Sequence, residues 1–410
     1  MEKPLHVLIA GGGLSGLCLA QGLRKSGHTV EVFERDPDHR RRTGYMLHMN
    51  AFGGEGLRTC LPDDLYELYL ETSRATPTRR ESIVLDSRLN ELSAQPHLGP
   101  PNDGPRPHTG VHRRTLRQIL LARIEDAVQL GSPAASYEEL EDSVRLVLAD
   151  GSTAEGDVLV GADGIRSAIR AQRLPAAQVI EATVDGIGVY GRSPLPPDVI
   201  ADLPELLLQG VIIVTDMRGN RLLLGPFQPR RTIADAPADL APDVELDAVE
   251  PYIMVSCSLM PGTVVPPARE WTAETAPMLR TSMQQVVGDW HPALRGIVER
   301  IDLESMFSIP FGRLDPPDPW TPSRVTLIGD AAHAMLPTLG MGANLSLRDA
   351  GALCRRLEAF GRGEQDLLGA IGAYEDEMRN IVYPFMRMTA EHDKHFGGGA
   401  LQRDRQPAGA

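Results

Sequence analysis

The chain has 410 residues, enough for two domains or one large composite domain, and 42% of them are hydrophobic, which supports a sizeable core. The formal net charge of −14 disfavours binding to nucleic acid or to an anionic membrane surface, and it mildly disfavours a strongly anionic substrate. The four cysteines lack metal or disulfide spacing, and neither a signal peptide nor an apolar run of membrane-spanning length is recognised. We therefore expect a soluble cytoplasmic protein with reduced thiols.

The first predicted element is a short apolar strand, Val7 to Ala10, which stops at three glycines before a helical pattern begins at Leu14. Gly11, Gly13 and Gly16 fit the pattern G-x-G-x-x-G. The first glycine allows a tight turn, the second lets a pyrophosphate approach the backbone, and the third lets helix and strand pack closely. The N-terminus of the helix also presents unpaired N–H groups to phosphate. This stretch is therefore a candidate dinucleotide-binding turn.

A second apolar strand, Val30 to Phe33, ends at Glu34, at the spacing expected for the acid that binds a ribose diol. A carboxylate at this position repels a 2′-phosphate, so the site should hold the adenosine of FAD or NAD and not that of NADP. Leu14, Ser15 and Arg35 complete the candidate contacts of this turn. The alternative is a purely structural strand–helix–strand unit that binds no nucleotide.

Two later strand ends also carry glycine beside a carboxylate. Residues 157–161 run into Asp163 and Gly164, and residues 324–328 run into Gly329 and Asp330. Ligands of α/β sheets bind at the carboxyl ends of strands. Each aspartate could instead cap the helix that follows; we favour binding for Asp330 and leave Asp163 open. Three such junctions indicate a long ligand with several polar segments, as FAD is.

Between residues 183 and 267, short β-like runs separated by prolines and glycines predict a mostly antiparallel sheet. Helical patterns return at 276–287 and 292–300, and a last helix is expected over 367–392. The predicted fold is α/β: a Rossmann-like FAD-binding domain with a parallel sheet, a β-rich substrate domain on a mostly antiparallel sheet, and C-terminal helices. The predicted division is a discontinuous FAD-binding domain (1–72, 99–180 and 276–395), a substrate-binding domain (73–98 and 181–275) and a disordered tail (396–410).

The order and spacing of the three junctions resemble those of the single-component FAD-dependent aromatic hydroxylase-type monooxygenases, which have a para-hydroxybenzoate hydroxylase-like fold. In that family the first motif binds the ADP half of FAD. The middle motif, here with Asp163, takes part in binding FAD and NAD(P)H, and the last motif places its aspartate, here Asp330, beside the ribityl chain. The resemblance covers most of residues 1–72, 105–175 and 320–360, and it is faint between 180 and 300.

Two further patterns carry the same resemblance. The family's Arg-x-x-Leu pattern matches Arg113 to Leu116 and implies that Arg113 lies near the pyrophosphate and ribityl groups, although Arg114 beside it leaves the register open. The family's Gly-x-Gly-x-Asn helix start matches Gly340, Gly342 and Asn344, with Ala343 between the last two. A helix that begins near Gly342 would aim its N–H groups at the N1–C2=O edge of the flavin and stabilise the anionic reduced form.

The resemblance implies an FAD-dependent monooxygenase with non-covalent FAD. NADPH or NADH would reduce the flavin, O₂ would form a C4a-hydroperoxyflavin, and an aromatic or polyketide-like small molecule would be hydroxylated or epoxidised. Because the cofactor carries this chemistry, we expect no catalytic side chain and no metal. The candidate substrate residues are His48, Tyr190, Arg192, Met217 and Pro337. The alternative is a packing role for His48 and an ordinary place in the sheet for Tyr190, Arg192 and Met217.

Two other functions stay open. One is different flavin chemistry on the same scaffold, such as that of a reductase or a halogenase, although the three tryptophans do not match the W-x-W-x-I-P spacing of flavin halogenases. The other is a flavoprotein that sequesters a ligand without turnover. The expected partners are a small-molecule substrate, O₂ and NAD(P)H, and the protein should be a monomer or a homodimer.

Overall fold

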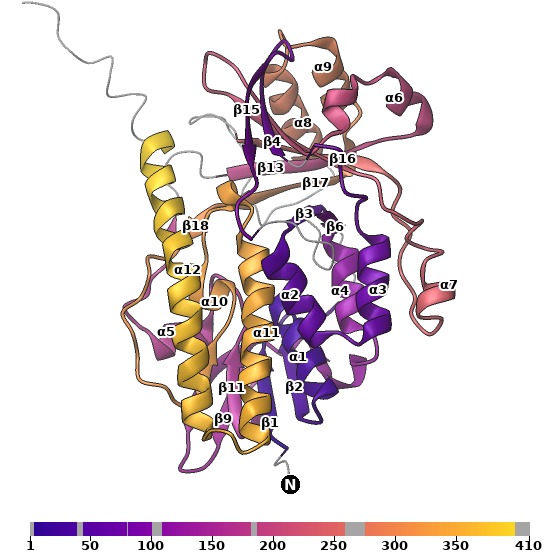
Figure 1. Cartoon of the computed structure of the whole chain (residues 1–410). Helices are drawn as coiled ribbons and strands as arrows, with labels where there is room; N and C mark the ends of the chain where they lie inside the picture. Colours follow the sequence, from indigo (N-terminus) through magenta and orange to yellow (C-terminus); the bar gives the residue numbers. More distant parts are fainter. Residues whose placement is uncertain are drawn as a thin grey trace, which may run out of the picture.

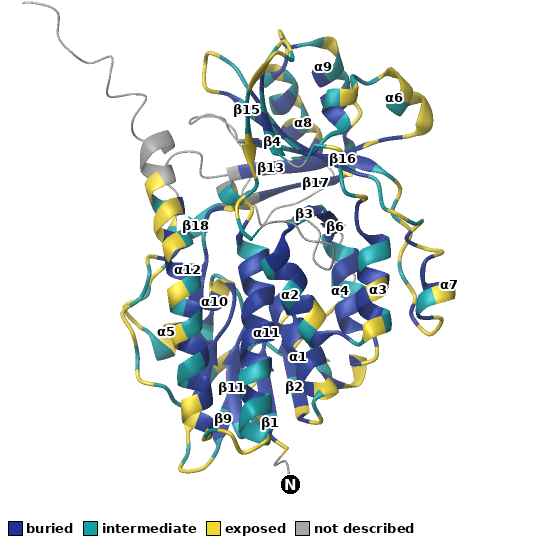
Figure 2. Ribbon diagram, viewed as in Figure 1, coloured by how far each residue is buried: buried dark blue, intermediate teal, exposed yellow. Residues whose placement is uncertain are grey.

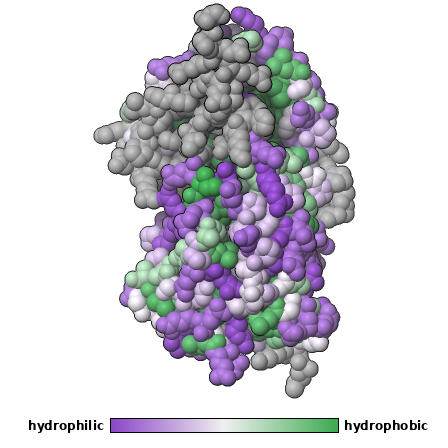
Figure 3. Space-filling view, turned by 90° about the vertical axis from the view of Figure 1, so that its left-hand side faces the viewer, coloured by the Kyte–Doolittle hydropathy of each residue, from purple (hydrophilic) through white to green (hydrophobic). Residues whose placement is uncertain are grey.

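The computed structural model describes residues 4–38, 44–79, 81–100, 109–181, 187–258 and 275–397. Two main sheets dominate it, one in the lower half of the view in Figure 1 and one in the upper half. Within these ranges, none of the helices combines the length and the hydrophobicity that a membrane span requires. On the face that carries α5 (Ala168–Arg173) and α12 (Leu367–Gly397), hydrophobic residues form small separate groups among hydrophilic ones (Figure 3).

The first sheet has five strands, all parallel, in the order β19-β11-β1-β2-β7. Its strands are continuous apolar runs, as expected for a sheet that is covered on both faces. Val7, Leu8 and Ile9 in the central strand have no exposed surface. The strands are β1 (His6–Ala10), β2 (Thr29–Glu34), β7 (Val128–Leu130), β11 (Val158–Gly161) and β19 (Val325–Leu327).

Helices and a small antiparallel sheet enclose the parallel sheet. Helix α1 packs against α2, α4 and α11, α12 packs along α11, and the strands β8, β9 and β10 form a meander in contact with β1 and β11. Figure 2 shows that α11 and the central strands form the buried interior. The bounds are α1 (Leu14–Lys25), α2 (Ala51–Cys60), α3 (Asp63–Thr72), α4 (Arg113–Leu121), α11 (Gly342–Gly361), β8 (Ala134–Glu139), β9 (Val144–Leu148) and β10 (Thr153–Gly156).

The second sheet has seven strands in the order β17-β13-β16-β15-β14-β4-β5. Its neighbours are antiparallel except β4 and β14, which are parallel. Helices α8 (Thr275–Val286) and α9 (Pro292–Glu299) share a hydrophobic core with this sheet. The strands are β4 (Glu81–Asp86), β5 (Glu91–Pro96), β13 (Ile187–Pro194), β14 (Val211–Thr215), β15 (Arg221–Phe227), β16 (Tyr252–Ser258) and β17 (Asp302–Pro310).

The alternation of side chains along β13 directs Tyr190 and Arg192 toward the parallel-sheet half. Val189 lies in the core with α8 and α9, whereas Tyr190 lies in a third hydrophobic cluster with Met46 of β3 (Met46–Met49). Because side chains alternate along a strand, Arg192 shares the face of Tyr190. The remaining elements are β6 (Thr109–His112), which pairs with β3, β12 (Ile180–Glu181), β18 (Gly312–Arg313), α6 (Pro197–Asp202), α7 (Pro237–Leu240), α10 (Asp330–His333) and the short 3₁₀ turns Glu125–Ala127, Glu205–Leu208 and Pro337–Leu339.

The predicted fold class, a parallel Rossmann-like sheet with a mostly antiparallel second sheet and C-terminal helices, is confirmed. One predicted boundary differs from the structure. The sequence pattern assigns the stretch that begins at residue 276 to the FAD-binding part, but residues 276–306 pack into the core of the seven-stranded sheet. The apolar spacing of Leu279 and Met283 indicates a buried helix face without indicating which sheet buries it. The last helix extends to Gly397. Most of the predicted loop at 95–109 and nearly all of the predicted tail at 396–410 lie outside the described residues.

Candidate functional site

The three glycine and carboxylate junctions meet at one edge of the parallel sheet. Strands β1, β11 and β19 are neighbours that run in the same direction, so their carboxyl ends lie side by side. The Ala162 N–H donates to the carbonyl oxygen of Ala10 at 2.7 Å, and the Ile328 N–H donates to the carbonyl oxygen of Gly161 at 3.0 Å. Segments more than 150 residues apart in the sequence are thereby joined in one surface.

The first turn combines two crowded glycines with one open glycine. Gly11 has φ +113°, and an added Cβ would lie 2.3 Å from the carbonyl oxygen of Ala162. A Cβ on Gly16 would lie 2.0 Å from the carbonyl oxygen of Gly11. Neither position has room for a side chain, whereas a Cβ on Gly13 would have no heavy atom within 4 Å. Gly13 precedes the first residue of α1, so the open space lies at the N-terminus of that helix.

The carboxylate of Glu34 is buried and held in a fixed position. It accepts the Gly12 N–H at 2.8 Å through Oε2 and the Asp36 N–H at 2.9 Å through Oε1. Arg35, the next residue, is exposed. A contact that the sequence did not suggest comes from Arg117, whose Nε donates to the carbonyl oxygen of Gly12 at 3.2 Å. Arg117 lies four residues after Arg113 and therefore on the same helix face, and this spacing was the signal in the sequence that could have indicated its place near the site.

Asp163 uses one oxygen to cap α5. Its Oδ2 accepts the Ala168 N–H at 2.7 Å, as the capping alternative predicts. The other oxygen, Oδ1, is buried and has no hydrogen-bond partner in the described chain. Burial raises the pKa of Asp163, although hydrogen bonds from Ser167 and from backbone N–H groups oppose the rise. A Cβ on Gly164 beside it would meet nothing within 4 Å, so this junction also faces open space.

Asp330 is the first residue of α10 and follows Gly329, whose φ is +60°. A Cβ on Gly329 would lie 3.0 Å from both Ser15 Oγ and Ser346 Oγ, so this junction packs directly on the starts of α1 and α11. Asp330 is exposed to solvent. Desolvation by the surrounding protein nevertheless raises the pKa of its carboxyl group, and the charges of His333 and Arg113 oppose this rise. Within the described chain no group hydrogen-bonds to this carboxylate.

The structure distinguishes the two adjacent arginines at the start of α4. Arg114 forms an ion pair with Asp247, whereas Arg113 lowers the pKa of Asp330 through its charge and therefore lies on the side of the site. The backbone N–H of Arg113 donates to the Tyr45 carbonyl oxygen at 2.9 Å. This arrangement supports Arg113, the residue favoured from the sequence, as the arginine that faces a bound anion.

The start of α11 is locked to β3 by Asn344. Its Nδ2 donates to the carbonyl oxygens of His48 at 2.8 Å and Gly340 at 3.1 Å, and its Oδ1 accepts the Asn50 N–H at 2.8 Å. Asn344 is buried, so it positions this helix and does not offer its own amide to a ligand. Gly340, with φ +63°, has nothing within 4 Å of a Cβ. The unpaired N–H groups around Gly342 therefore border open space.

Residues on either side of the Asn344 lock keep the helix start accessible. Ala343 and Gly342 are half-buried, and Pro337, in the 3₁₀ turn that precedes the helix, is exposed. Beneath this turn His333 and Asp349 form an ion pair with no exposed surface, at 2.5 Å between Nε2 and Oδ2. The same Oδ2 accepts the Gly329 N–H at 3.1 Å. Burial opposes protonation of His333, but the carboxylates of Asp349 and Asp330 raise its pKa above the ordinary value.

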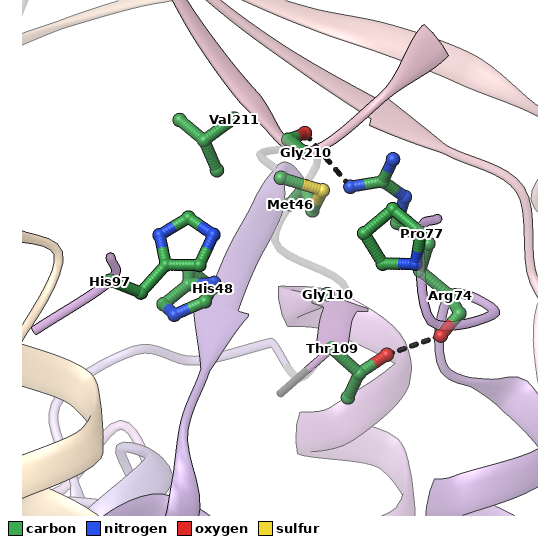
Figure 4. A pocket seen from close by; sticks show the side chains of 9 residues that line it. All are labelled: Met46, His48, Arg74, Pro77, His97, Thr109, Gly110, Gly210 and Val211. Atoms are coloured by element: carbon green, nitrogen blue, oxygen red, sulfur yellow. Dashed lines mark hydrogen bonds between the residues drawn. The ribbon is translucent and has the colours of Figure 1, made fainter. Parts of the chain in front are cut away.

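A pocket lies where the parallel-sheet half meets the seven-stranded sheet. The empty space in it, open solvent included, is about 330 Å³. Figure 4 shows the rings of His48 and His97 side by side, and their centroids are 4.3 Å apart. The buried Arg74 donates through Nη1 to the Gly210 carbonyl oxygen at 2.9 Å and through Nη2 to that of Leu208 at 3.0 Å. Met46, Pro77, Thr109, Gly110 and Val211 complete the lining.

Tyr190 and Arg192 lie in an aromatic cluster that Met46 links to this pocket. Tyr190 stacks on Phe307 with 5.1 Å between ring centroids, and the Arg192 guanidinium lies 5.7 Å from the centroid of Tyr252. The sequence did not single out Arg74, His97 or Tyr252, because no local pattern marks them.

Met217 is the one candidate that the structure separates from the rest. It is fully exposed in the turn between β14 and β15. The opposite end of β15 approaches the pocket, since a Cβ on Gly225 would lie 2.5 Å from Met46 Cε. The turn therefore lies at the far end of this hairpin, away from the other candidates.

The residues present fit an extended dinucleotide such as FAD. Open glycines at two junctions, Gly13 and Gly164, and at Gly340 before α11 leave room for a ligand along the sheet edge. Asp163 Oδ1 and the Asp330 carboxylate lack partners within the described chain. Two helix N-termini and Arg113 supply positive potential between these carboxylates. Among the described residues, no group of three histidine, cysteine or acidic side chains could hold a metal ion.

Comparison with known families finds two matching models. One, described as an FAD binding domain, matches residues 317–389, and the other, described as an NAD(P)-binding Rossmann-like domain, matches residues 9–42. These two segments contain the last and the first of the three junctions. The prediction of FAD as the cofactor is confirmed by the first of these matches.

Relatives lie among monooxygenases and hydroxylases. The dual O-methyltransferase/FAD-dependent monooxygenase elcB of Phaeosphaeria nodorum is 29% identical over 97% of this chain and 45% of its own length. Salicylate hydroxylase of Pseudomonas putida is 28% identical over 95% of this chain and 85% of its own. The crystal structure of a candidate FAD-containing monooxygenase from Photorhabdus luminescens has a TM-score of 0.78 and 28% identity, and the match covers 96% of this chain and 98% of that one.

The chain spans less than half the length of elcB and of related dual-function enzymes from two Cercospora species. It matches salicylate hydroxylase and the Photorhabdus protein over most of their lengths. The resemblance that the three junctions predicted is confirmed, and the chain is a relative of the FAD-dependent monooxygenases.

Proposed function

We propose that the chain is an FAD-dependent monooxygenase that uses NADPH or NADH and O₂ to hydroxylate or epoxidise an aromatic or polyketide-like small molecule. The observation that carries this proposal is the convergence of three glycine and carboxylate junctions at one edge of the parallel sheet. Relatives named as monooxygenases, a salicylate hydroxylase and a zeaxanthin epoxidase support the reaction class.

Each junction has a role toward FAD. Glu34 accepts hydrogen bonds from the adenosine ribose, and the N-terminus of α1, with Gly13 open in front of it, takes the pyrophosphate. Arg113 supplies a positive charge to the pyrophosphate, and Asp330 accepts hydrogen bonds from the ribityl hydroxyls. Arg35, Leu14 and Ser15 border the adenylate end, and Asp163 Oδ1 is the remaining acceptor. These assignments remain predictions of contact.

At the other end of the cofactor, the N-terminus of α11 faces the oxygen-bearing edge of the flavin ring. Bound FAD supplies electron transfer from NAD(P)H and the transfer of one oxygen atom from O₂. The chain's own part is to hold the ring, favour negative charge on it and exclude water from the pocket. Asn344 keeps the helix start in place through His48, Gly340 and Asn50.

The NAD(P)-binding model matches residues 9–42, which form the same turn that we assign to the adenylate end of FAD. NAD(P)H would therefore dock transiently elsewhere on the surface. A cytoplasmic location, supported by four buried cysteines that form no disulfide, and a monomeric or homodimeric state belong to this proposal.

The first test measures flavin binding. We expect purified protein to carry FAD, and we expect Gly13→Val to lower FAD affinity at least about tenfold, because the new side chain occupies the space before α1. Asp330→Ala should have a similar effect. Gly288→Ala is the matched control, since its Cβ would meet no atom closer than 3.5 Å. Unchanged flavin content in both site variants would contradict the site.

The second test separates an enzyme from a ligand-sequestering flavoprotein. NADPH and NADH oxidation is followed with a panel of phenols, hydroxybenzoates and polyketide aromatics, and products are examined for a mass gain of one oxygen. Substrate-stimulated oxidation with that mass gain supports the monooxygenase. A flavin-loaded protein that binds ligands yet consumes no NAD(P)H with any of them overturns it, and oxidation without oxygen incorporation indicates a reductase.

A further inference from the structure

The connection between β15 and β16, residues 228–251, leaves the seven-stranded sheet and lies against the parallel-sheet half. We call this segment the strap. Its Arg230 N–H donates to the carbonyl oxygen of Ser73 at 2.9 Å, and its Arg231 N–H donates to that of Glu71 at 3.0 Å. The strap contains α7, which packs against α3 (Figure 1). Six of its side chains are acidic and two are basic, so it is suited to form ion pairs with a basic helix.

Nonpolar residues anchor the strap in both halves of the molecule. Ala236, Ala241 and Val244 are buried in the core of the parallel-sheet half. Ile233 is buried in the third hydrophobic cluster, on the side of the seven-stranded sheet, and Leu246 packs against both cores. The position of the strap therefore depends on the packing of both halves.

One strap residue, Asp247, holds two successive turns of α4. Its carboxylate forms an ion pair with Arg114 and accepts a hydrogen bond from Gln118 Nε2 at 2.7 Å. Its backbone N–H donates in return to Gln118 Oε1 at 3.4 Å. Arg114 and Gln118 are four residues apart and share one face of the helix, so Asp247 fixes that face.

A second attachment lies just beyond the end of α4. Arg123 donates to both carboxylate oxygens of Asp243 in the strap, at 2.6 Å and 2.7 Å, and also forms an ion pair with Asp64 of α3 at 2.7 Å. Its φ of +67° is uncommon for a residue with a side chain and persists where surrounding contacts hold the backbone. The strap thus holds α4 along its length and at its C-terminal end.

A neighbouring face of the same helix borders the proposed cofactor site. Arg113 lies on the side of Asp330, and Arg117 Nε donates to the Gly12 carbonyl oxygen in the first turn at 3.2 Å. Successive residues of an α-helix are about 100° apart around its axis, so a rotation of α4 moves the faces of Arg113 and Arg114 together. The contacts of Asp247 with Arg114 and Gln118 therefore also determine where Arg113 points.

We propose that the strap is a latch on α4 and that Asp247 is a positioning residue, which fixes the rotation of the helix so that Arg113 meets the FAD pyrophosphate. The inference rests on the proposed function, because FAD is the ligand. It also has a reciprocal consequence. If the latch strengthens FAD binding by a given factor, bound FAD must stabilise the closed strap by the same factor, although FAD does not contact it.

Fluorescence titration of FAD-free protein with FAD and with riboflavin, which lacks the pyrophosphate, tests the role of Asp247. Asp247→Ala should lower FAD affinity at least about fivefold and riboflavin affinity less than about twofold. Removing a negative charge near a bound anion would by itself strengthen binding, so weaker FAD binding reports the position of Arg113 and not the change in charge. Asp247→Glu, which keeps the carboxylate, should retain most of the affinity.

Glu245→Ala is the matched control, because Glu245 is an exposed residue of the same strap and its loss changes the net charge equally. It should leave the affinity for both flavins within about twofold of the unmodified protein. The inference is overturned if Asp247→Ala binds FAD as the unmodified protein does, if it loses FAD and riboflavin affinity by the same factor, or if Glu245→Ala weakens FAD binding as much.

Hydrogen exchange of the unmodified protein measures the reciprocal effect and does not depend on any variant. Saturation with FAD should slow exchange over residues 241–251 by at least about twofold, and the slowing should be smaller in Asp247→Ala. If riboflavin binds too weakly to compare, this measurement decides the question. Unmodified protein that binds no FAD contradicts the proposed function, whereas protein that binds FAD without any change of exchange in the strap contradicts only this inference.

Discussion

His333 and Asp349 show how a single buried pair can determine the geometry of a binding turn. Neither side chain has exposed surface, and Asp349 also accepts the Gly329 N–H that begins the turn to Asp330. Breaking such a pair leaves a buried group uncompensated, whereas replacing both partners with apolar residues is often nearly neutral. Asp349→Leu should therefore lower the free energy of unfolding by about 3 kcal/mol, and His333→Phe combined with Asp349→Leu should recover part of that loss.

Urea unfolding of the FAD-free proteins measures these effects, and FAD affinity provides a second readout. Both variants should bind FAD more weakly than the unmodified chain, because each loses the hydrogen bond to Gly329. If the double variant is no more stable than Asp349→Leu, the two side chains do not stabilise the fold as a pair.

His112 predicts a specific loss of stability in acid. Burial, followed by the charges of Arg192 and Arg114, lowers its pKa to about 3 from the ordinary 6.5. Between these two values the unfolded chain binds a proton that the folded chain excludes. The stability from neutral His112 is thus complete above pH 6.5 and falls as the pH decreases toward 3, by at most about 1.4 kcal/mol per pH unit.

The His112→Asn variant lacks this titration and can still hydrogen-bond to Tyr252, which lies 2.8 Å from Nδ1 in the unmodified chain. Urea unfolding at pH 7, 6 and 5 should therefore give a shallower pH dependence for the variant. If the free energies of unfolding of the variant and the unmodified protein change equally with pH across this range, His112 does not titrate differently in the folded and unfolded states.

At the scale of elements, α11, the helix that we propose to face the flavin, packs closely against α2. A Cβ on Gly56 would lie 2.1 Å from the Leu347 carbonyl oxygen, and one on Gly351 would lie 2.9 Å from Gly56 Cα. Gly56→Ala must push these helices apart. We expect a loss of about 2 kcal/mol in unfolding free energy, together with weaker FAD binding because the start of α11 moves. Gly288→Ala should change stability by less than about 0.5 kcal/mol.

Chemical unfolding and FAD titration of the two glycine variants measure this difference. A Gly56→Ala protein with unchanged stability would mean that α11 adjusts to a methyl group. A Gly56→Ala protein that loses stability but keeps its FAD affinity would show that FAD binding does not depend on the packing between α2 and α11.

Most elements of the site half were predictable because their signals are local. A strand that stops at glycines, with Glu34 at the end of the next strand, is readable from neighbouring residues alone. The placement of α8, α9 and β17 was not predictable, because apolar spacing reports that a face is buried and not which core buries it. Asp163 shows a second limit of the sequence, which offers helix capping and ligand binding as alternatives for it. In the structure one carboxylate oxygen caps α5 and the other has no partner in the described chain, so one side chain can serve both roles.

At the scale of the whole molecule, the order of the three junctions indicated that they share a ligand, and the parallel register of β1, β11 and β19 brings them together. The substrate side was far less legible. Arg74, His97 and Val211 come from three separate segments and meet only through the packing of the two halves. Met217 was a reasonable sheet candidate, but only the strand register shows that it lies in the distal turn.

The convergence of distant segments predicts that FAD stabilises the fold as a whole and that its fragments do so less. A ligand at a hundredfold excess over its dissociation constant adds about 2.7 kcal/mol, which for a chain of this length corresponds to about 3 °C in melting temperature. In the proposed site, ADP would contact only the turn near Gly13 and Glu34, and FMN only the junction near Asp330 and the start of α11. Each fragment at the same concentration should therefore shift the melting temperature by less than FAD does.

Thermal unfolding of FAD-free protein with each ligand measures these shifts. The Gly13→Val variant should abolish the shift caused by ADP and retain most of the shift caused by FMN. Equal shifts with ADP and FAD would restrict the site to the first turn and contradict a ligand that spans all three junctions.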